Sequence, residues 1–169
     1  TDLTHTGDAG NRALQQYRVR AEHYDSELEP FEPLRQEAIQ RLNLRPGETV
    51  LDVGCGTGLS FEPLLERLGP RGHVVGIEQC PEMMAKAQRR LHDRRARQVR
   101  LVQAPVEEAQ WPGQADAALL HFTHDILRRP AALENVLGHL APGARVVATG
   151  LQWAAPWVWP VNLFVLGAA

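Results

Sequence analysis

The 169-residue sequence has little of what marks a secreted, metal-binding or membrane protein. Its two cysteines, Cys55 and Cys80, are too few for a disulfide framework and do not have the spacing of zinc ligands. The amino terminus is polar and lacks the apolar core of a signal peptide. The apolar segment at residues 151–169 is short and interrupted by two prolines and an asparagine, so we expect no stable membrane span. These absences favour a cytoplasmic location.

A strong charge of either sign is also absent, because 18 lysines and arginines stand against 20 aspartates and glutamates and give a net charge of −2. Such a balance gives no reason to expect a polyanionic partner. The arginine-rich stretch at residues 89–100 contains no aromatic residues, which favours a solvated basic face over an RNA-binding one. We therefore expect no nucleic-acid partner.

What the sequence does contain is a glycine-rich turn directly after a short apolar run. Residues 49–53 are typical of a buried parallel strand, with Asp52 near its carboxyl end. Leucines at helical spacing follow the turn. A strand, a glycine loop and a helix in this order form the ligand-binding unit of open α/β sheets. The glycines occupy alternate positions: Gly54, Gly56 and Gly58.

The spacing of these glycines differs from the dinucleotide fingerprint G-x-G-x-x-G. The stretch Val50–Gly58 instead resembles motif I of the class I S-adenosylmethionine-dependent methyltransferases, whose pattern is close to V-L-D-x-G-C-G-T-G. The resemblance covers residues 17–150, and Tyr17–Asp25 is similar to a segment of quinone-biosynthesis methyltransferases. It implies a doubly wound, mostly parallel α/β sheet of the Rossmann-like methyltransferase fold. It also implies S-adenosyl-L-methionine as cofactor and methyl transfer to a small-molecule acceptor. If the apolar tail at 151–169 lines the acceptor pocket, it would suit an apolar or lipid-like acceptor.

A second part of the resemblance follows the next expected strand. Glu78 ends that strand about 20 residues past the glycine loop, where nucleotide-binding folds place an acid on the ribose hydroxyls. Glu78–Met84 resembles the pattern D-x-S-x-x-M-L, whose first methionine packs on the adenine; Met83 takes this position, with core filling as the alternative. The cofactor contacts that the resemblance implies are Tyr17, Tyr24, Asp52, Gly54, Cys55, Gly56, Gly58, Glu78, Gln79, Met83, Pro105, Val106 and His121.

The sequence departs from the family at one of these positions. Most relatives have an Asp–Ala pair after the third strand, with the aspartate bonding the adenine amino group, and Pro105-Val106 stands there in this chain. The side-chain contact is lost. The backbone amide of Val106 and apolar packing remain available to hold the ring.

Catalytic residues are less well defined than cofactor contacts. His121 and His124 follow the fourth expected strand, and together with Tyr24 they are the candidate catalytic residues. The alternatives are that His121 contacts the methionine portion of the cofactor and that His124 caps or packs. Methyl transfer is an in-line displacement that needs no covalent enzyme intermediate, so catalysis can consist largely of orientation, and the identity of any base stays open. No third cluster of ligands accompanies these histidines, and we expect no metal site.

The chain divides into three expected parts: a helical segment at 1–45, the cofactor-binding domain at 46–150 and an apolar tail at 151–169. Apolar spacing predicts an amphipathic helix at residues 11–28, whose Tyr17 and Tyr24 either close the cofactor pocket or pack on the sheet. Pro30 and Pro33 separate it from a second helix at 34–42. Strands are expected near 49–53, 73–78, 99–104, 115–120 and 144–149, with a turn at 141–143 before the last.

The family has seven strands, so the sixth and seventh are expected to be missing from this chain. The outer edge of the fifth strand would then be covered by the remainder of a longer polypeptide or by a second copy in a homodimer. Two functions of other classes also stay open. One is a non-catalytic module that binds an adenosine cofactor. The other is a nucleotide-dependent oxidoreductase, against which the glycine spacing argues.

Overall fold

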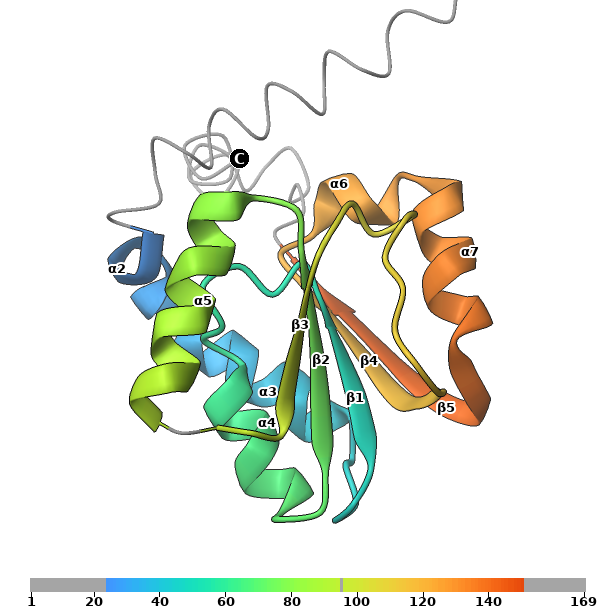
Figure 1. Cartoon of the computed structure of the whole chain (residues 1–169), viewed down its shortest axis with the longest axis horizontal. Coiled ribbons are helices and arrows are strands. Elements are labelled where there is room, and N and C mark those ends of the chain that lie inside the picture. Colours follow the sequence, from blue (N-terminus) through green and yellow to red (C-terminus); the bar gives the residue numbers. More distant parts are fainter. Residues whose placement is uncertain (1–23, 95, 151–169) are drawn as a thin grey trace, which may run out of the picture.

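A parallel five-stranded sheet forms the centre of the computed structural model, which describes residues 24–94 and 96–150 (Figure 1). The strand order is β3–β2–β1–β4–β5, and every neighbouring pair is parallel. The order reverses between β1 and β4, and this confirms the expected doubly wound α/β class. The strands are β1 (Thr49–Val53), β2 (His73–Glu78), β3 (Val99–Gln103), β4 (Ala115–His121) and β5 (Leu140–Thr149).

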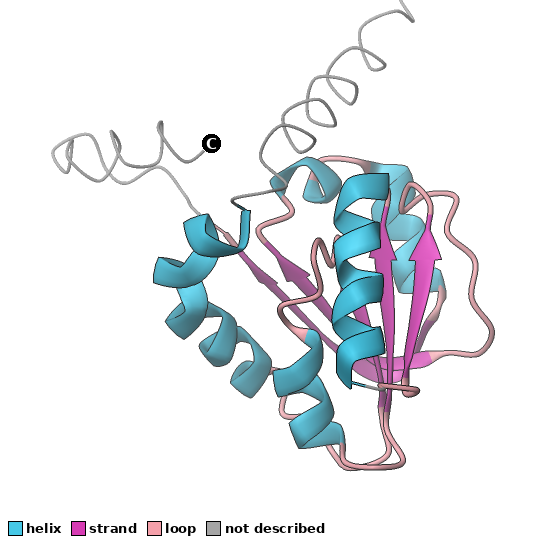
Figure 2. Ribbon diagram, turned by 60° about the vertical axis from the view of Figure 1, so that its left-hand side comes forward, coloured by secondary structure: helices cyan, strands magenta, loops and turns pink. Residues whose placement is uncertain are grey.

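Helices cover both faces of this sheet (Figures 1 and 2). One face carries α3 (Glu32–Arg41), α4 (Phe61–Leu68) and α5 (Pro81–Arg94), and the other carries α6 (His124–Leu127) and α7 (Pro130–Gly138). The short α2 (Tyr24–Leu28) and the 3-10 turn η1 (Glu29–Phe31) lead into α3. The described chain therefore has three layers, with the sheet in the middle.

Successive side chains along each strand point to opposite faces of the sheet and fill the two cores. Val50, Val74 and Leu119 pack against α3 and α4, whereas Leu51 and Ile77 pack towards α6 and α7. All five side chains are fully buried, and each stabilises the fold by roughly 1.5–3 kcal/mol. A strand buried on both faces reads as an unbroken apolar run, which is why the sequence predicted β1 and β2 with their observed bounds.

One expectation about local structure was wrong. The turn at 141–143 lies inside β5, which begins at Leu140, and the pairing shifts register between Ala115 and Ala117. Gly143 has a φ of 81°, and a proline is tolerated here because an edge strand or a bulge needs fewer backbone donors. Pro30 and Pro33 lie, as expected, at the boundary between α2, which ends at Leu28, and α3, which begins at Glu32. They occupy the first turns of η1 and α3, where no backbone donor is needed.

The helix α3 shares the core of the sheet domain, although it lies within the expected segment 1–45. Ala38, Ile39 and Leu42 are fully buried in one cluster with Val50 and Leu119. Tyr17 and the tail at 151–169 lie outside the described residues. Among residues 24–94 and 96–150, no strand pairs with the outer edge of β5. None of the helices in those ranges combines the length and apolar character that crossing a bilayer requires.

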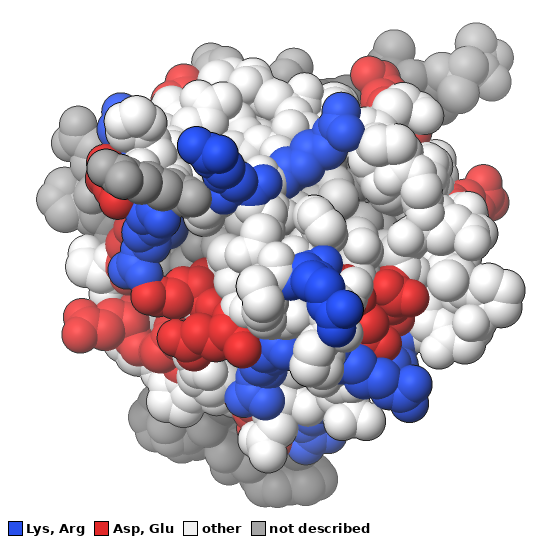
Figure 3. Space-filling view, turned by 60° about the horizontal axis from the view of Figure 1, so that its bottom comes forward, with Lys and Arg blue, Asp and Glu red and all other residues white. Residues whose placement is uncertain are grey.

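Charged side chains of both signs are interspersed on the face shown in Figure 3. Elsewhere in the described chain, ion pairs join separate elements, such as Arg94 of α5 with Glu62 of α4 and Arg145 of β5 with Glu48 before β1. The basic side chains of this face form no continuous patch.

Candidate functional site

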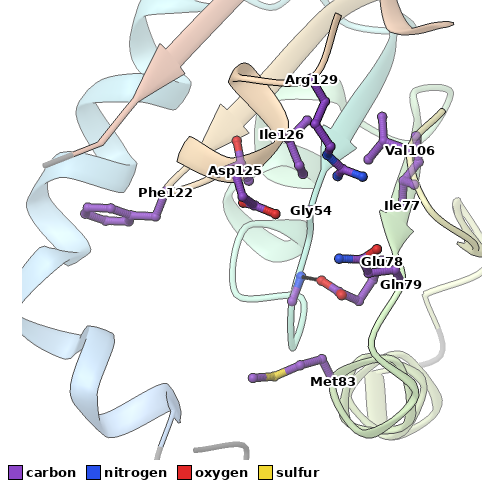
Figure 4. A pocket seen from close by; sticks show the side chains of 12 residues that line it. Gly54, Ile77, Glu78, Gln79, Met83, Val106, Phe122, Asp125, Ile126 and Arg129 are labelled. Atoms are coloured by element: carbon purple, nitrogen blue, oxygen red, sulfur yellow. Dashed lines mark hydrogen bonds between the residues drawn. The ribbon is translucent and has the colours of Figure 1, made fainter. Parts of the chain in front are cut away.

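Two pockets meet at the carboxyl ends of β1, β2 and β4, where open α/β sheets bind their ligands. Both are lined by Gly54, Gly56 and Phe122. The first, here called the β2 pocket, is shown in Figure 4 and also has lining residues Ile77, Glu78, Gln79, Met83, Val106, Asp125, Ile126 and Arg129. The second, the α3 pocket, is additionally lined by Leu28, Arg35, Asp52, Cys55, Thr57, Leu59, Ser60 and His121.

The glycine loop is fixed to the end of β2 and to the segment after β4. The backbone N–H groups of Gly54 and Cys55 both donate to the Ile77 carbonyl, at 2.8 and 2.9 Å. Gly54 has a φ of 70°, and a Cβ built on it would lie 2.6 Å from the Thr123 methyl carbon. A side chain at position 54 would therefore displace Thr123, which lines the β2 pocket.

Gly58 has a different place from the other two glycines. It lines neither of the two pockets, and a Cβ there would lie 2.4 Å from the Phe61 ring. Its φ of 82° lies in the left-handed region that side chains disfavour. Gly58 thus serves the turn into α4 and the packing of Phe61.

Glu78 links β2 to the glycine loop. Its Oε2 accepts a hydrogen bond from the Gly56 N–H at 3.0 Å, and its Oε1 accepts one from the Cys80 N–H at 2.7 Å. Burial raises the pKa of this carboxyl, the backbone hydrogen bonds offset part of the rise, and the nearby Asp125 adds to it. Each carboxylate oxygen has a second acceptor site, which a ligand hydroxyl can use.

Apolar side chains form two walls of the β2 pocket. Met83 at the start of α5 and Val106 after β3 are almost fully buried, and they lie on opposite sides of the pocket in Figure 4. A flat aromatic group fits between such walls. Pro105 does not line the pocket; its carbonyl accepts a hydrogen bond from the Glu108 N–H at 3.0 Å.

The α3 pocket brings a buried carboxyl and a buried guanidinium together. Asp52 and Arg35 are each 2% exposed, and no described residue bonds the Oδ2 of Asp52. Burial raises the pKa of Asp52 to about 7, with Arg35 opposing the rise and Glu78 adding to it. Arg35 forms an ion pair with Glu32 of the same helix. The pocket therefore offers groups of opposite charge to a ligand.

His121 lies in the α3 pocket, whereas His124 lines neither pocket. The Nδ1 of His121 lies 2.5 Å from the Thr149 hydroxyl, and its Nε2 is buried without a partner among the described residues. Burial and the nearby Arg35 lower the pKa of His121 to about 4, so its ring is neutral at pH 7. The exposed His124 ring lies against Gly150, where a Cβ would come within 2.3 Å of it. This contact favours packing for His124.

The remaining predicted cofactor contacts are Tyr17, Tyr24 and Cys55. Tyr17 lies outside the described residues, and Tyr24 is described only as the first residue of α2. Burial raises the pKa of the Cys55 thiol well above its usual value, so it lacks the thiolate of a nucleophile. The described part of the chain holds no cluster of three or more side chains suited to a metal ion.

Among the lining residues that sequence reasoning missed are Arg35, Phe122, Asp125 and Arg129. A signal for Arg35 was present, because it precedes Ala38, Ile39 and Leu42 at helical spacing and so lies in an apolar stripe. Phe122 has a φ of 56°, and its ring meets the Phe31 ring edge-on at 5.1 Å. Non-glycine residues with positive φ are uncommon, and they cluster at functional sites.

Comparisons with known proteins agree with this geometry. Residues 50–143 match the protein family described as "Methyltransferase domain". The chain is 30% identical over 115 residues to the demethylmenaquinone methyltransferase of Oceanobacillus iheyensis, which covers 67% of this chain and 48% of that protein. It is 33% identical over 138 residues to the trans-aconitate 2-methyltransferase of Pseudomonas paraeruginosa, which covers 75% and 46%. The chain thus spans about half the length of these relatives.

A solved structure shares the fold. The structure described as the "DhpI-SAM-HEP complex" has a TM-score of 0.64 and 23% identity, with 88% of this chain and 68% of that chain covered. At this identity the likeness concerns the fold alone.

Proposed function

Because the chain belongs to the class I S-adenosylmethionine-dependent methyltransferase family, we propose that it binds this cofactor across the two pockets and transfers its methyl group to a small-molecule acceptor. The proposal rests on the different linings of the β2 pocket and the α3 pocket, which share Gly54, Gly56 and Phe122. One pocket suits a nucleoside, and the other suits an amino acid.

The adenosine portion fits the β2 pocket. The Glu78 carboxylate stands at the end of β2 with free acceptor sites, and a vicinal diol supplies two donors to such a group. Met83 and Val106 provide apolar surfaces for the two faces of the adenine ring. Gln79 lies beside Glu78 in the same pocket.

The methionine portion fits the α3 pocket, where its two charges find complementary groups. The Arg35 guanidinium is suited to the α-carboxylate, and the unpaired Oδ2 of Asp52 is suited to the ammonium group. Binding of the ammonium group would favour the ionised form of Asp52 and offset the burial that raises its pKa. A neutral or singly charged ligand would leave one of the two groups uncompensated.

Catalysis would consist mainly of orientation. The bound sulfonium supplies an activated methyl group, and the chain's own residues hold it in line with the acceptor and exclude water. His121 has a pKa of about 4 and takes up a proton poorly at neutral pH, so we assign to it a hydrogen bond to a bound group through Nε2. His124, packed on Gly150, has no catalytic part in this proposal.

The acceptor is proposed to be apolar, at least where it meets the reacting methyl group. The Phe31 and Phe122 rings lie edge-on to each other, and the His121 ring lies 4.4 Å from that of Phe122. Phe122 lines both pockets, so this aromatic group borders the junction where the sulfonium would lie. Aromatic rings attract cations over their faces and pack against apolar acceptors.

Isothermal titration with S-adenosylhomocysteine tests the proposal, with reduced nicotinamide dinucleotide as the matched negative ligand. We expect one molecule of S-adenosylhomocysteine to bind per chain and the dinucleotide not to bind. Binding of the dinucleotide alone would favour an oxidoreductase and contradict the proposal. Methyl transfer to acceptors of graded polarity, followed by mass spectrometry, then separates an enzyme from a non-catalytic binding module.

A further inference from the structure

The Arg129 side chain lines the β2 pocket and has one hydrogen-bonding edge without a partner among the described residues. Its Nη1 donates to both carboxylate oxygens of Glu107, at 2.7 and 2.8 Å. Its Nε and Nη2 are buried, and no residue in the described ranges accepts a hydrogen bond from them. These two atoms form one side edge of the planar guanidinium, so the ion pair leaves a whole two-donor edge unused.

An unused edge of this kind is unfavourable unless something binds it. A buried donor without a partner carries the full cost of its lost hydration, and the cost is larger for a charged group. The guanidinium cannot lose its proton to avoid this cost. Buried polar groups in native structures are accordingly almost always hydrogen-bonded. The Glu107 pair alone therefore does not account for the placement of Arg129.

The surroundings of Arg129 indicate what would bind there. In Figure 4 its guanidinium ends near Ile126 and Val106, on the side of the pocket away from Met83. Both of these neighbours are apolar, and Pro105 does not line the pocket. Of these three neighbouring side chains, only that of Arg129 has polar atoms to offer a base.

We propose that the Nε–Nη2 edge of Arg129 donates to a ring nitrogen of the cofactor's adenine and makes Arg129 a specificity-determining residue. The inference rests on the proposed function, which places the adenosine portion in this pocket. Adenine has three ring nitrogens that accept hydrogen bonds, N1, N3 and N7, and one exocyclic amine that donates. One N–H of this edge matches an acceptor of this kind, and the edge opposes any base that presents an N–H at the same point.

The test combines ligand analogues that lack one ring nitrogen each with variants that lack the edge. Wild type, Arg129→Met, Arg129→Lys and the exposed neighbour Arg128→Met are titrated with S-adenosylhomocysteine and with its 1-deaza, 3-deaza and 7-deaza analogues. Lysine can keep the ion pair with Glu107 but has no second N–H edge, so it serves if the methionine variant does not fold. Thermal unfolding of each variant confirms that it is folded.

We expect one of the three analogues to bind about tenfold more weakly than S-adenosylhomocysteine to wild type and to Arg128→Met, as the loss of one hydrogen bond from a charged donor predicts. The difference should disappear in Arg129→Met and Arg129→Lys. Equal binding of all analogues to wild type, or a penalty of unchanged size in both Arg129 variants, would overturn the inference. Failure of S-adenosylhomocysteine to bind wild type would instead refute the proposed function, and the inference with it.

Discussion

Glu78 Oε2 accepts a hydrogen bond of 3.0 Å from the Gly56 N–H and so ties the end of β2 to the middle of the glycine loop. Both residues line the β2 pocket, and Gly56 also lines the α3 pocket. A ligand that spans the two pockets has to pass this contact. The Glu78 carboxylate therefore lies close to both halves of a bound ligand. Its removal should lower the binding affinity more than it lowers the free energy of unfolding.

Replacing Glu78 with alanine should weaken S-adenosylmethionine binding about tenfold or more. The variant loses charge-assisted hydrogen bonds to the ribose hydroxyls, which contribute roughly 1.5–3 kcal/mol. Isothermal titration measures the effect, and the exposed Glu108→Ala provides the control because it changes the same charge outside the pocket. Wild-type affinity in Glu78→Ala would show that the ribose does not bind to Glu78.

Arg35→Met should weaken the binding of the amino-acid half of the ligand and leave the binding of the adenosine half unchanged. We expect S-adenosylhomocysteine, which carries the α-carboxylate, to bind about tenfold or more weakly to this variant, because its partner guanidinium is gone. Binding of 5′-methylthioadenosine, which has neither the carboxylate nor the ammonium group, should be unchanged. Arg41→Met, an exposed arginine of the same helix, is the control. Equal losses for both ligands would point to a folding defect in place of a carboxylate contact.

Asp52→Asn should stabilise the protein in a pH-dependent way. The pKa of Asp52 is about 7 in the folded protein against a usual value of 3.8, so the folded state keeps a proton that the unfolded chain releases. Wild-type stability therefore falls as the pH rises from about 4 to about 7, by up to about 4 kcal/mol. The asparagine side chain does not titrate, so the variant does not lose this stability.

Urea unfolding at several pH values checks the prediction for Asp52. The difference in free energy of unfolding between Asp52→Asn and wild type should be near zero at about pH 4, grow towards about pH 7 and then stay constant. The exposed Asp93→Asn should show no such growth. A difference that does not vary with pH would show that Asp52 is ionised throughout.

The sequence predicted those parts of the fold that depend on local pattern. β1 and β2 were placed with their observed bounds, because a buried parallel strand between turn residues has few other interpretations. The start of β5 was misplaced, because Pro142-Gly143 reads as a turn unless the pairing with β4 is known. A register shift depends on how two strands pair, so it cannot be predicted from the sequence of one segment.

Predicted residues line the pockets mainly where a motif and a strand end coincide, and several other lining residues were missed. The predicted residues Asp52, Gly54, Gly56 and Glu78 all line the pockets. Arg35 and Arg129 come from segments without a motif, and they reach the site only through the packing of α3 and the loop before α7. The positive φ of Phe122 has no sequence signal, because aromatic residues are not typical of that conformation.

A contact that links the amino-terminal segment to the glycine loop yields a further prediction. Asp25 in α2 accepts hydrogen bonds from the Thr57 hydroxyl at 2.5 Å and from Arg90 Nη2 at 2.7 Å. If this segment closes over the cofactor, Asp25→Ala should raise the amide exchange rate of residues 24–28 and weaken cofactor binding severalfold, in line with about 1 kcal/mol for a partly exposed pair.

Hydrogen exchange with and without S-adenosylhomocysteine measures the closure. Exchange in residues 24–28 should slow when the ligand saturates wild type, and the slowing should be smaller in Asp25→Ala. The exposed Asp93→Ala on α5 should behave as wild type. Identical exchange in free and saturated wild type would leave α2 as a packing element that takes no part in binding.

Titration of wild type and Gly56→Leu with S-adenosylmethionine tests the central claim most directly. Gly56 has a φ of 56° and lines both pockets, so a leucine would occupy the space where the two halves of the cofactor join. We expect one molecule to bind wild type and none to bind Gly56→Leu, while circular dichroism shows that the variant keeps its secondary structure. Equal binding to a folded Gly56→Leu, or no binding to wild type, would contradict the account.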